Sequence, residues 1–228
     1  MKNIVESSQL HNREFVFADR EEAGRQLGDL VGKEAGDKGL LLAIPSGGVP
    51  VAAAMLPFLP WPLDLLLVRK VQIPWNTEAG FGAVNLDGDR FFNQRLLKAL
   101  HLTDEVVESQ ISKALRTIEQ RNELFRGGRP FADIAGKDVI IVDDGLASGY
   151  TMLAALQYAR RRKPASLAIA VPTGLLETVE NLAARVERLY CLNIREATPF
   201  AVASAYRNWF DETDAGIVEL LERLNEGS

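Results

Sequence analysis

The stretch VIIVDDGLASGYTM, residues 139–152, decides the fold of this chain. It begins with four consecutive β-branched residues, Val139–Val142, which are typical of a strand buried on both faces in the middle of a parallel sheet. Asp143 and Asp144 follow directly, so we expect both acids at the carboxyl end of that strand. The composition of residues 151–162 then predicts a helix, which completes a strand–loop–helix unit.

The loop between the acids and the helix has small side chains that leave its backbone open to a ligand: Gly145, Ala147, Ser148 and Gly149. Backbone N–H groups at a helix N-terminus bind phosphate, and the hydroxyls of Ser148 and Thr151 can add hydrogen bonds. Two adjacent carboxylates would repel such an anion unless they face its neutral hydroxyl groups or a divalent cation. We therefore expect a ligand that carries a phosphate and a polyol, together with Mg²⁺.

Composition narrows the class of protein. A net charge of −5 and a pI near 5.2 provide no general attraction for nucleic acid, so phosphate chemistry must come from a local site. The single cysteine, Cys191, excludes an internal disulfide and is expected to be a buried apolar residue, while His11 and His101 lack metal-ligand spacing. No window approaches the roughly 20 apolar residues of a membrane span, and we expect a cytoplasmic protein.

Strands and helices alternate along the chain, which predicts a single α/β domain over residues 1–228. We expect a doubly wound, five-stranded, mainly parallel sheet flanked by helices, with its ligand where the strand order reverses. The five predicted strands are residues 40–44, 63–68, 139–142, 166–171 and 188–194.

Two further segments carry candidate site residues. The turn after the first strand contains Ser46, Gly47 and Gly48, whose glycines could equally serve only backbone geometry. Arg69 and Lys70 end the second predicted strand, and on a parallel sheet they would point toward the cleft that holds Asp143.

Residues 71–93 show no sustained helical period and contain three glycines and a hairpin-like turn at residues 85–89. Long segments of this kind at the cleft side of a domain are commonly lids. Glu78 precedes the glycines and could bring a carboxylate over the site, although a solvated loop acid is the simpler interpretation.

The stretch 139–152 resembles the binding signature of type I phosphoribosyltransferases: an apolar strand, two acids and a small loop that closes with Thr-Gly-x-Thr or similar residues. An ordinary strand–turn–helix with a chance acid pair is the alternative, whereas a Walker P-loop is excluded because no Gly-Lys-Ser/Thr follows the strand. The resemblance implies that Asp143 and Asp144 contact the ribose 2′- and 3′-hydroxyls of 5-phosphoribosyl-1-pyrophosphate (PRPP). It also implies that they hold Mg²⁺, directly or through PRPP hydroxyls and water.

The same resemblance assigns the remaining roles. The implied pyrophosphate contacts are Ser46, Gly47 and Gly48 with the cations Arg69 and Lys70, and residues 71–93, with Glu78, would form the mobile catalytic lid. The implied 5′-phosphate loop consists of Gly145, Leu146, Ala147, Ser148, Gly149, Tyr150 and Thr151. Residues 198–228, which contain Tyr206 and Trp209, could form a small hood for base recognition or simply pack on the domain edge.

Similarity extends over almost the whole chain. The fragments FADREEAG, PSGGVPVA, VRK, EAGFGAV, RNELFRGG, AVPTG and AYRNWF occur in the order seen in a subgroup of stand-alone, predicted phosphoribosyltransferases of unsettled acceptor. The chain departs from the pattern at Ser46, where arginine is expected before Gly-Gly, and this weakens the predicted grip on pyrophosphate.

The resemblance implies a Mg²⁺-dependent enzyme of nucleotide metabolism that transfers the phosphoribosyl group of PRPP to a nucleobase or related acceptor and releases pyrophosphate. Its implied partners are PRPP and a small-molecule acceptor, without nucleic acid or membrane, and the implied assembly is a homodimer. A non-catalytic PRPP or nucleotide sensor and a phosphoribosyl or nucleotide hydrolase remain open, because fold and acid pair are common to all three.

Overall fold

The computed structural model describes residues 3–196 and 198–226, except the side chains of residues 77 and 78. Contacts between residues divide the chain into two compact units. Unit 1 comprises residues 1–66, 131–148 and 162–228, and unit 2 comprises residues 67–130 and 149–161. The sequence alone does not predict this division.

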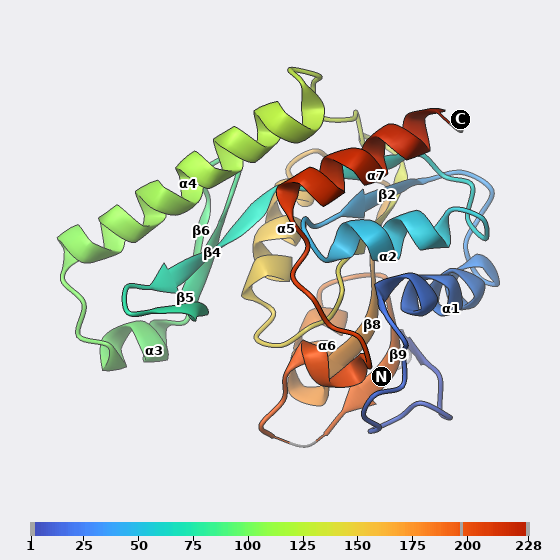
Figure 1. Cartoon of the computed structure of the whole chain (residues 1–228), viewed down its shortest axis with the longest axis horizontal. Coiled ribbons are helices and arrows are strands. Elements are labelled where there is room, and N and C mark those ends of the chain that lie inside the picture. The colour runs from blue at the N-terminus through green and yellow to red at the C-terminus, as the bar shows by residue number, and fades with distance from the viewer. Residues whose placement is uncertain (1–2, 197, 227–228) are drawn as a thin grey trace. The chain divides into compact units, whose positions relative to one another are not determined.

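The described part of unit 1 is built on a six-stranded parallel sheet with the order β1-β9-β8-β7-β2-β3 (Figure 1). Its strands are β1 (Ile4–Glu6), β2 (Leu40–Ala43), β3 (Leu63–Leu65), β7 (Asp138–Val142), β8 (Ser166–Leu175) and β9 (Arg188–Arg195). The α/β fold with a parallel sheet confirms the predicted class. The predicted count of five is wrong by one, because β1 is too short to show a strand period and pairs at the edge beside β9.

The central strand β7 is buried as its composition predicts. Its four apolar residues, Val139–Val142, are at most 4% exposed, and β2 and β8 pair with β7 on either side. Cys191 in β9 is fully buried, which confirms its predicted place in the core. The sheet therefore presents Asp143 and Asp144 directly after a rigid, solvent-shielded strand.

The helices that pack on this sheet are α1 (Arg20–Gly32), α2 (Gly48–Met55), α6 (Leu176–Ala183) and the 3-10 helix η1 (Val202–Ala205). Helix α7 (Asp214–Glu226) packs on α2. Asp19 caps α1 by accepting a hydrogen bond from the backbone N–H of Glu22. Helices α1 and α2 lie side by side in Figure 1, and a Cβ at Gly24 would lie 2.4 Å from the Val51 carbonyl oxygen. Glycine at this position thus allows the two backbones to approach closely.

Unit 2, as far as it is described, contains a three-stranded antiparallel sheet and three helices (Figure 1). These elements are β4 (Val68–Ile73), β5 (Asn76–Asn85), β6 (Arg90–Phe92), α3 (Gln94–Ala99), α4 (Asp104–Arg126) and α5 (Tyr150–Arg160). Most of residues 71–93 therefore lie in strands. The sequence predicted only a long loop there, because it shows no helical period. Gly82 interrupts the alternation of side chains by which a strand is recognised in a sequence. The structure requires glycine there, since a Cβ would lie 2.3 Å from the Phe91 carbonyl oxygen.

The second predicted strand, residues 63–68, is also corrected. It ends at Leu65, and Val68 begins β4 in the other sheet. Arg69 and Lys70 consequently lie inside an antiparallel strand, opposite Val84 and Ala83, and not at the tip of a parallel strand. The run LDLLLV is apolar from Leu65 to Val68 and so conceals the break between the two strands. Consecutive apolar residues indicate burial, but they do not indicate which sheet a strand joins.

None of the helices in the described ranges combines the length with the apolar character that crossing a membrane requires.

Candidate functional site

Asp143 and Asp144 lie at the carboxyl end of β7, as predicted. The Asp144 backbone N–H donates to Asp143 Oδ1 at 2.9 Å, which fixes one carboxylate against the chain. Burial, reinforced by the charge of Asp144, raises the pKa of Asp143 well above its ordinary value. Burial also raises the pKa of Asp144, although the Arg20 guanidinium opposes that rise.

The Asp144 carboxylate is held by α1 and by the turn before α2. Arg20, the first residue of α1, donates from Nε to Asp144 Oδ2 at 2.9 Å, and its side chain is only 7% exposed. A Cβ on Gly47 would lie 1.9 Å from the same oxygen, so the carboxylate rests directly on the glycine backbone. Any other residue at position 47 would displace it.

The predicted pyrophosphate turn adjoins the acid pair. The Gly48 N–H donates to the Ile44 carbonyl at 3.0 Å, and a Cβ on Gly48 would lie 2.6 Å from the Val142 carbonyl oxygen. The Pro45–Ser46 peptide bond is cis. The structure thus brings Ser46, Gly47 and Gly48 together with the acids within unit 1, and the close approaches require both glycines.

The loop after the acids is anchored by its neighbours in unit 1. Leu146 donates its N–H to the Thr173 carbonyl at 2.9 Å, and Thr178 Oγ1 donates to the Ala147 carbonyl at 2.6 Å. Ala147 and Ser148 are exposed, which keeps their backbone accessible. Gly145 contacts η1, since a Cβ there would lie 2.5 Å from Val202.

Gly149, Tyr150 and Thr151 continue this loop along the chain into unit 2. Gly149 precedes the first residue of α5 with φ of 77°, a left-handed conformation that favours glycine. The helix begins at Tyr150, so the predicted loop-to-helix transition is present one residue earlier than expected.

The remaining predicted residues also belong to unit 2. Arg69 and Lys70 are half-buried in β4 and border a small hollow of about 40 Å³ beside α4. The Glu78 side chain lies outside the described residues. Within the units, then, the structure groups the acids with the glycine turn in unit 1, and it places the two cations with the start of α5 in unit 2.

Sequence reasoning missed Arg20 as a site residue. Its guanidinium lies 3.9 Å from the centre of the Trp209 ring, and Nη1 donates to the Phe210 carbonyl at 2.7 Å. Tyr206, in the same C-terminal segment, donates its hydroxyl to the Asp144 carbonyl at 2.6 Å, and burial raises the pKa of that phenol. The available signal was indirect: both residues lie in fragments shared with the family, FADREEAG and AYRNWF.

The donor set at Asp143 and Asp144 fits Mg²⁺ as a partly protein-bound ion. Among residues 3–196 and 198–226, no three Asp, Glu, His or Cys side chains gather into a metal cluster. Magnesium ordinarily uses one or two carboxylates together with water and substrate oxygens, so the two acids suffice only if a ligand supplies the rest.

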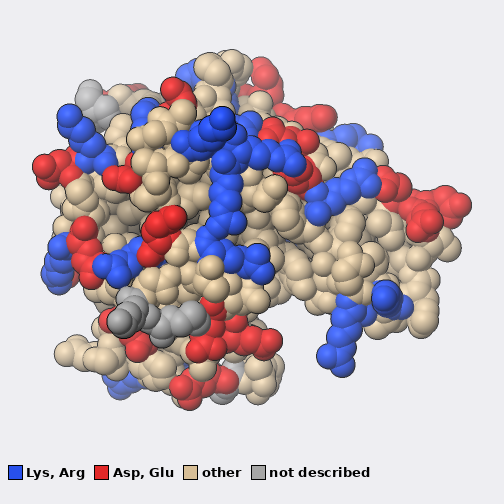
Figure 2. Space-filling model, turned by 180° about the vertical axis from the view of Figure 1, so that it is seen from behind, with Lys and Arg blue, Asp and Glu red and all other residues tan. Residues whose placement is uncertain are grey.

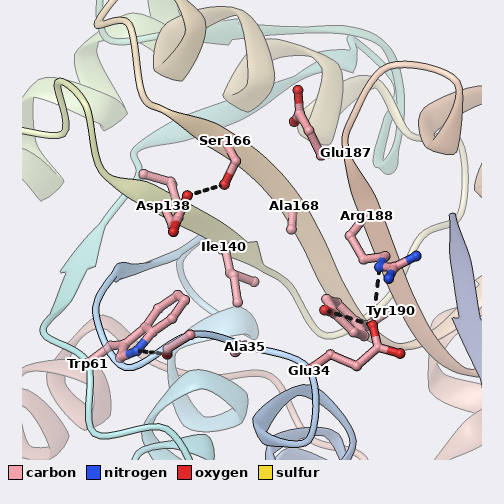
Figure 3. A pocket seen from close by; sticks show the side chains of 12 residues that line it. Glu34, Ala35, Trp61, Asp138, Ile140, Ser166, Ala168, Glu187, Arg188 and Tyr190 are labelled. Atoms are coloured by element: carbon pink, nitrogen blue, oxygen red, sulfur yellow. Dashed lines mark hydrogen bonds and ion pairs between the residues drawn. The ribbon is translucent and has the colours of Figure 1, made fainter.

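A cavity of about 350 Å³ lies at the opposite edge of the sheet, at the amino ends of β7, β8 and β9 (Figure 3). Its charged groups satisfy one another. Glu34 accepts from Arg188 Nε at 3.1 Å and from the Tyr190 hydroxyl at 3.4 Å, and Ser166 donates to Asp138 at 2.5 Å. We therefore assign this cavity no part in the site.

Charge is mixed on the face of the molecule that Figure 2 presents. Figure 2 shows acidic and basic side chains interspersed on the face it presents, in keeping with the modest net charge of −5.

Comparisons with known proteins agree with the acid-pair signature. The statistical model of the phosphoribosyl transferase domain matches residues 21–205. A curated protein of Mycobacterium tuberculosis, recorded for strains CDC 1551 and H37Rv and provisionally named a phosphoribosyl transferase, is 37% identical over 213 residues. The match covers 92% of this chain and 47% of that protein, so the chain spans about half the length of the curated relatives it matches.

A solved structure shares the fold. The crystal structure of TT1426 from Thermus thermophilus is 32% identical in sequence and superposes with a TM-score of 0.71. The match covers 91% of this chain and 98% of TT1426, so the two chains correspond along nearly their full lengths.

Proposed function

The chain belongs to the phosphoribosyl transferase domain family, and from that premise we propose that it transfers the 5-phosphoribosyl group of PRPP to a small acceptor with release of pyrophosphate. The acceptor class that we propose is a nucleobase or a related heterocycle. The observation that carries the proposal is the pair Asp143 and Asp144 at the end of β7, packed against the glycine turn at residues 46–48.

Each part of the site has a proposed task in binding PRPP. The two acids accept hydrogen bonds from the ribose 2′- and 3′-hydroxyls, and residues 145–151 hold the 5′-phosphate through backbone N–H groups. Ser46, Gly47 and Gly48 offer backbone to the pyrophosphate. Arg69 and Lys70 are proposed to neutralise the pyrophosphate charge, and Glu78 is proposed to lie in the lid.

The proposed reaction needs no covalent nucleophile from the protein. A nitrogen of the acceptor attacks the anomeric carbon, the bond to pyrophosphate breaks, and positive charge develops on the ribose ring in an oxocarbenium-like transition state. Where the attacking nitrogen carries a proton, that proton passes to solvent. The protein contributes by positioning the two substrates and by excluding water. When bound with PRPP, Mg²⁺ would neutralise charge on the departing pyrophosphate.

A non-catalytic PRPP sensor is the second candidate, and Ser46 favours it. Where the family pattern has arginine, serine carries no charge to stabilise a leaving pyrophosphate. A sensor would need only the binding signature, whereas an enzyme also needs a pyrophosphate grip and an acceptor pocket.

Pyrophosphate release separates the candidates. The wild-type chain would be incubated with PRPP and Mg²⁺, with and without a panel of purine, pyrimidine and pyridine bases, while calorimetry measures PRPP binding in parallel. Acceptor-dependent release supports the transferase, and equal release without a base indicates a hydrolase. Binding without release with any base indicates a sensor, and no binding refutes all three. Asp144→Asn is the matched control and should reduce both signals.

A further inference from the structure

We propose that Arg20 is a positioning residue that ties the C-terminal segment 206–212 to the acid pair, so that binding of PRPP at Asp144 and order in this segment are coupled. The inference rests on the proposed function and extends it to a residue outside the signature. All of the groups involved belong to unit 1.

The first support is the way Arg20 holds Asp144. Both side chains are largely buried, at 7% and 17% exposed, and the Nε–Oδ2 distance is 2.9 Å. A carboxylate can accept about four hydrogen bonds, so one bond from Arg20 leaves acceptor sites for ribose hydroxyls or a metal ion. Arg20 thus orients the acid without occupying all of it.

The second support is that the same guanidinium binds the C-terminal segment at several points. Nη1 donates to the Phe210 carbonyl at 2.7 Å and approaches Glu212 Oε1 at 3.4 Å, and the Trp209 ring lies 3.9 Å from the guanidinium carbon. The geometry requires arginine, because a lysine ammonium is a compact charge that lacks a planar fork.

The segment has a further direct contact with the acids. Tyr206 donates its hydroxyl to the Asp144 carbonyl at 2.6 Å, so side chain and backbone of Asp144 are both reached from this cluster. The segment is also held to the chain before α1, where Arg207 and Asn208 donate their N–H groups to Phe17 and Ala18, each at 2.8 Å. Two exchangeable amides can therefore report on its order.

The test compares PRPP affinity, measured by calorimetry with Mg²⁺, in the wild type and three variants. Arg20→Met should weaken PRPP binding about 10- to 100-fold, the range seen when groups that orient ligating carboxylates are removed. Arg20→Lys should recover part of the loss, since it restores a positive charge beside Asp144. Arg25→Met, which removes an exposed partner of Glu21 on the same helix, should bind as the wild type does.

Hydrogen exchange of the wild type keeps the inference testable if Arg20→Met does not fold. Saturating PRPP with Mg²⁺ should slow amide exchange in residues 206–212, and this slowing should be lost in Arg20→Met or reduced in Arg20→Lys. A folded Arg20→Met protein that binds PRPP with wild-type affinity would overturn the inference. So would amide exchange in residues 206–212 of the wild type that is unchanged by saturating PRPP. In either case PRPP would still bind, so the proposed function would stand. A wild-type protein that binds no PRPP would refute both.

Discussion

In the proposed site, the orientation of Asp144 is fixed by single residues around it. Arg20 donates to one oxygen of the Asp144 carboxylate, and Tyr206 donates to the Asp144 carbonyl. The Gly47 backbone lies directly against the same carboxylate. A group held from several sides keeps its orientation when it meets a ligand, which is the requirement for a preorganised site.

Gly47→Ala tests the contact between Gly47 and the Asp144 carboxylate. The added Cβ would lie 1.9 Å from Asp144 Oδ2, so the carboxylate must move, and we expect at least a tenfold loss of PRPP affinity. Overpacking should also cost about 1–3 kcal/mol of stability. Calorimetry and thermal unfolding measure the two effects. Gly36→Ala is the control, because no atom lies within 4 Å of its Cβ position. Unchanged affinity in Gly47→Ala would separate the turn from PRPP binding.

Asp143 should limit stability at neutral pH. Burial and the charge of Asp144 raise the pKa of Asp143 in the folded protein above the ordinary value of about 3.9. The protonated acid is therefore favoured by folding, and this contribution is complete below about pH 4 and is lost as pH rises through the folded pKa. Asp143→Asn, which stays neutral, should raise the Tm at pH 8 and have little effect near pH 4.

The control for this pH dependence is Asp29→Asn on α1, which removes an exposed partner of Lys33. It should change the Tm by less than Asp143→Asn does at pH 8, since exposed ion pairs contribute about 0–1 kcal/mol. A Tm difference for Asp143→Asn that is equal at both pH values would contradict the assigned cost of ionisation.

At the scale of elements, the turn between β5 and β6 supports α5. Asn85 is fully buried and donates from its side chain to Asp89 at 3.0 Å and to the Ala154 carbonyl at 3.2 Å. Asp89 also pairs with Arg161 at 2.6 Å. Shortening residues 85–89 would thus disturb the helix that follows the proposed phosphate loop and would not test a lid cleanly.

Asn85→Ala should lower the free energy of unfolding by about 1–3 kcal/mol, because the Ala154 carbonyl would lose a buried donor. Urea denaturation measures this loss. Gln94→Ala, at an exposed position beginning α3, should change stability by less than about 0.5 kcal/mol, as is usual for surface substitutions. Equal stability of Asn85→Ala and the wild type would show that the turn does not support the helix.

The turn between β4 and β5 is the better place to test the proposed lid. Trp75 is 68% exposed there, so its removal should leave the fold of unit 2 intact. If residues 71–93 act as a lid, Trp75→Ala should lower kcat more than it lowers PRPP affinity. The reason is that a lid mainly stabilises the closed transition-state complex. Steady-state kinetics with the best acceptor measures kcat, and calorimetry measures PRPP affinity. Equal losses in kcat and in affinity would instead assign residues 71–93 to ground-state binding.

For the whole molecule, ligand binding should appear as stability. PRPP at 100 times its Kd should stabilise the folded chain by about 2.7 kcal/mol, which corresponds to a Tm increase of roughly 5–10 °C for a chain of this size. Removing Mg²⁺ with EDTA should abolish most of the increase. Asp144→Asn should show little increase with or without the metal. A full increase in the presence of EDTA would exclude a required metal.

The local sequence predicted the centre of this protein well. Strand β7, its acids, the small loop and the helix after it follow from short-range patterns, because burial on both faces and turn chemistry are written into neighbouring residues. The same reasoning predicted the parallel strands on either side of β7, apart from the end of β3 and the end of β8, which continues to Leu175 beyond the predicted residue 171. It also identified residues 46–48, whose contact with the acids follows from the pairing of β2 with β7.

Tertiary structure alone decided the partners of these elements. Arg20 and Asp144 are 124 residues apart, and Asp144 and Tyr206 are 62 apart, so no local pattern reveals that they meet. The division of LDLLLVRK between two sheets and the folding of residues 71–93 into strands were equally hidden. An apolar residue in the sequence indicates burial, and a glycine can indicate that another group lies very close. Which group that is depends on how distant segments of the chain pack together.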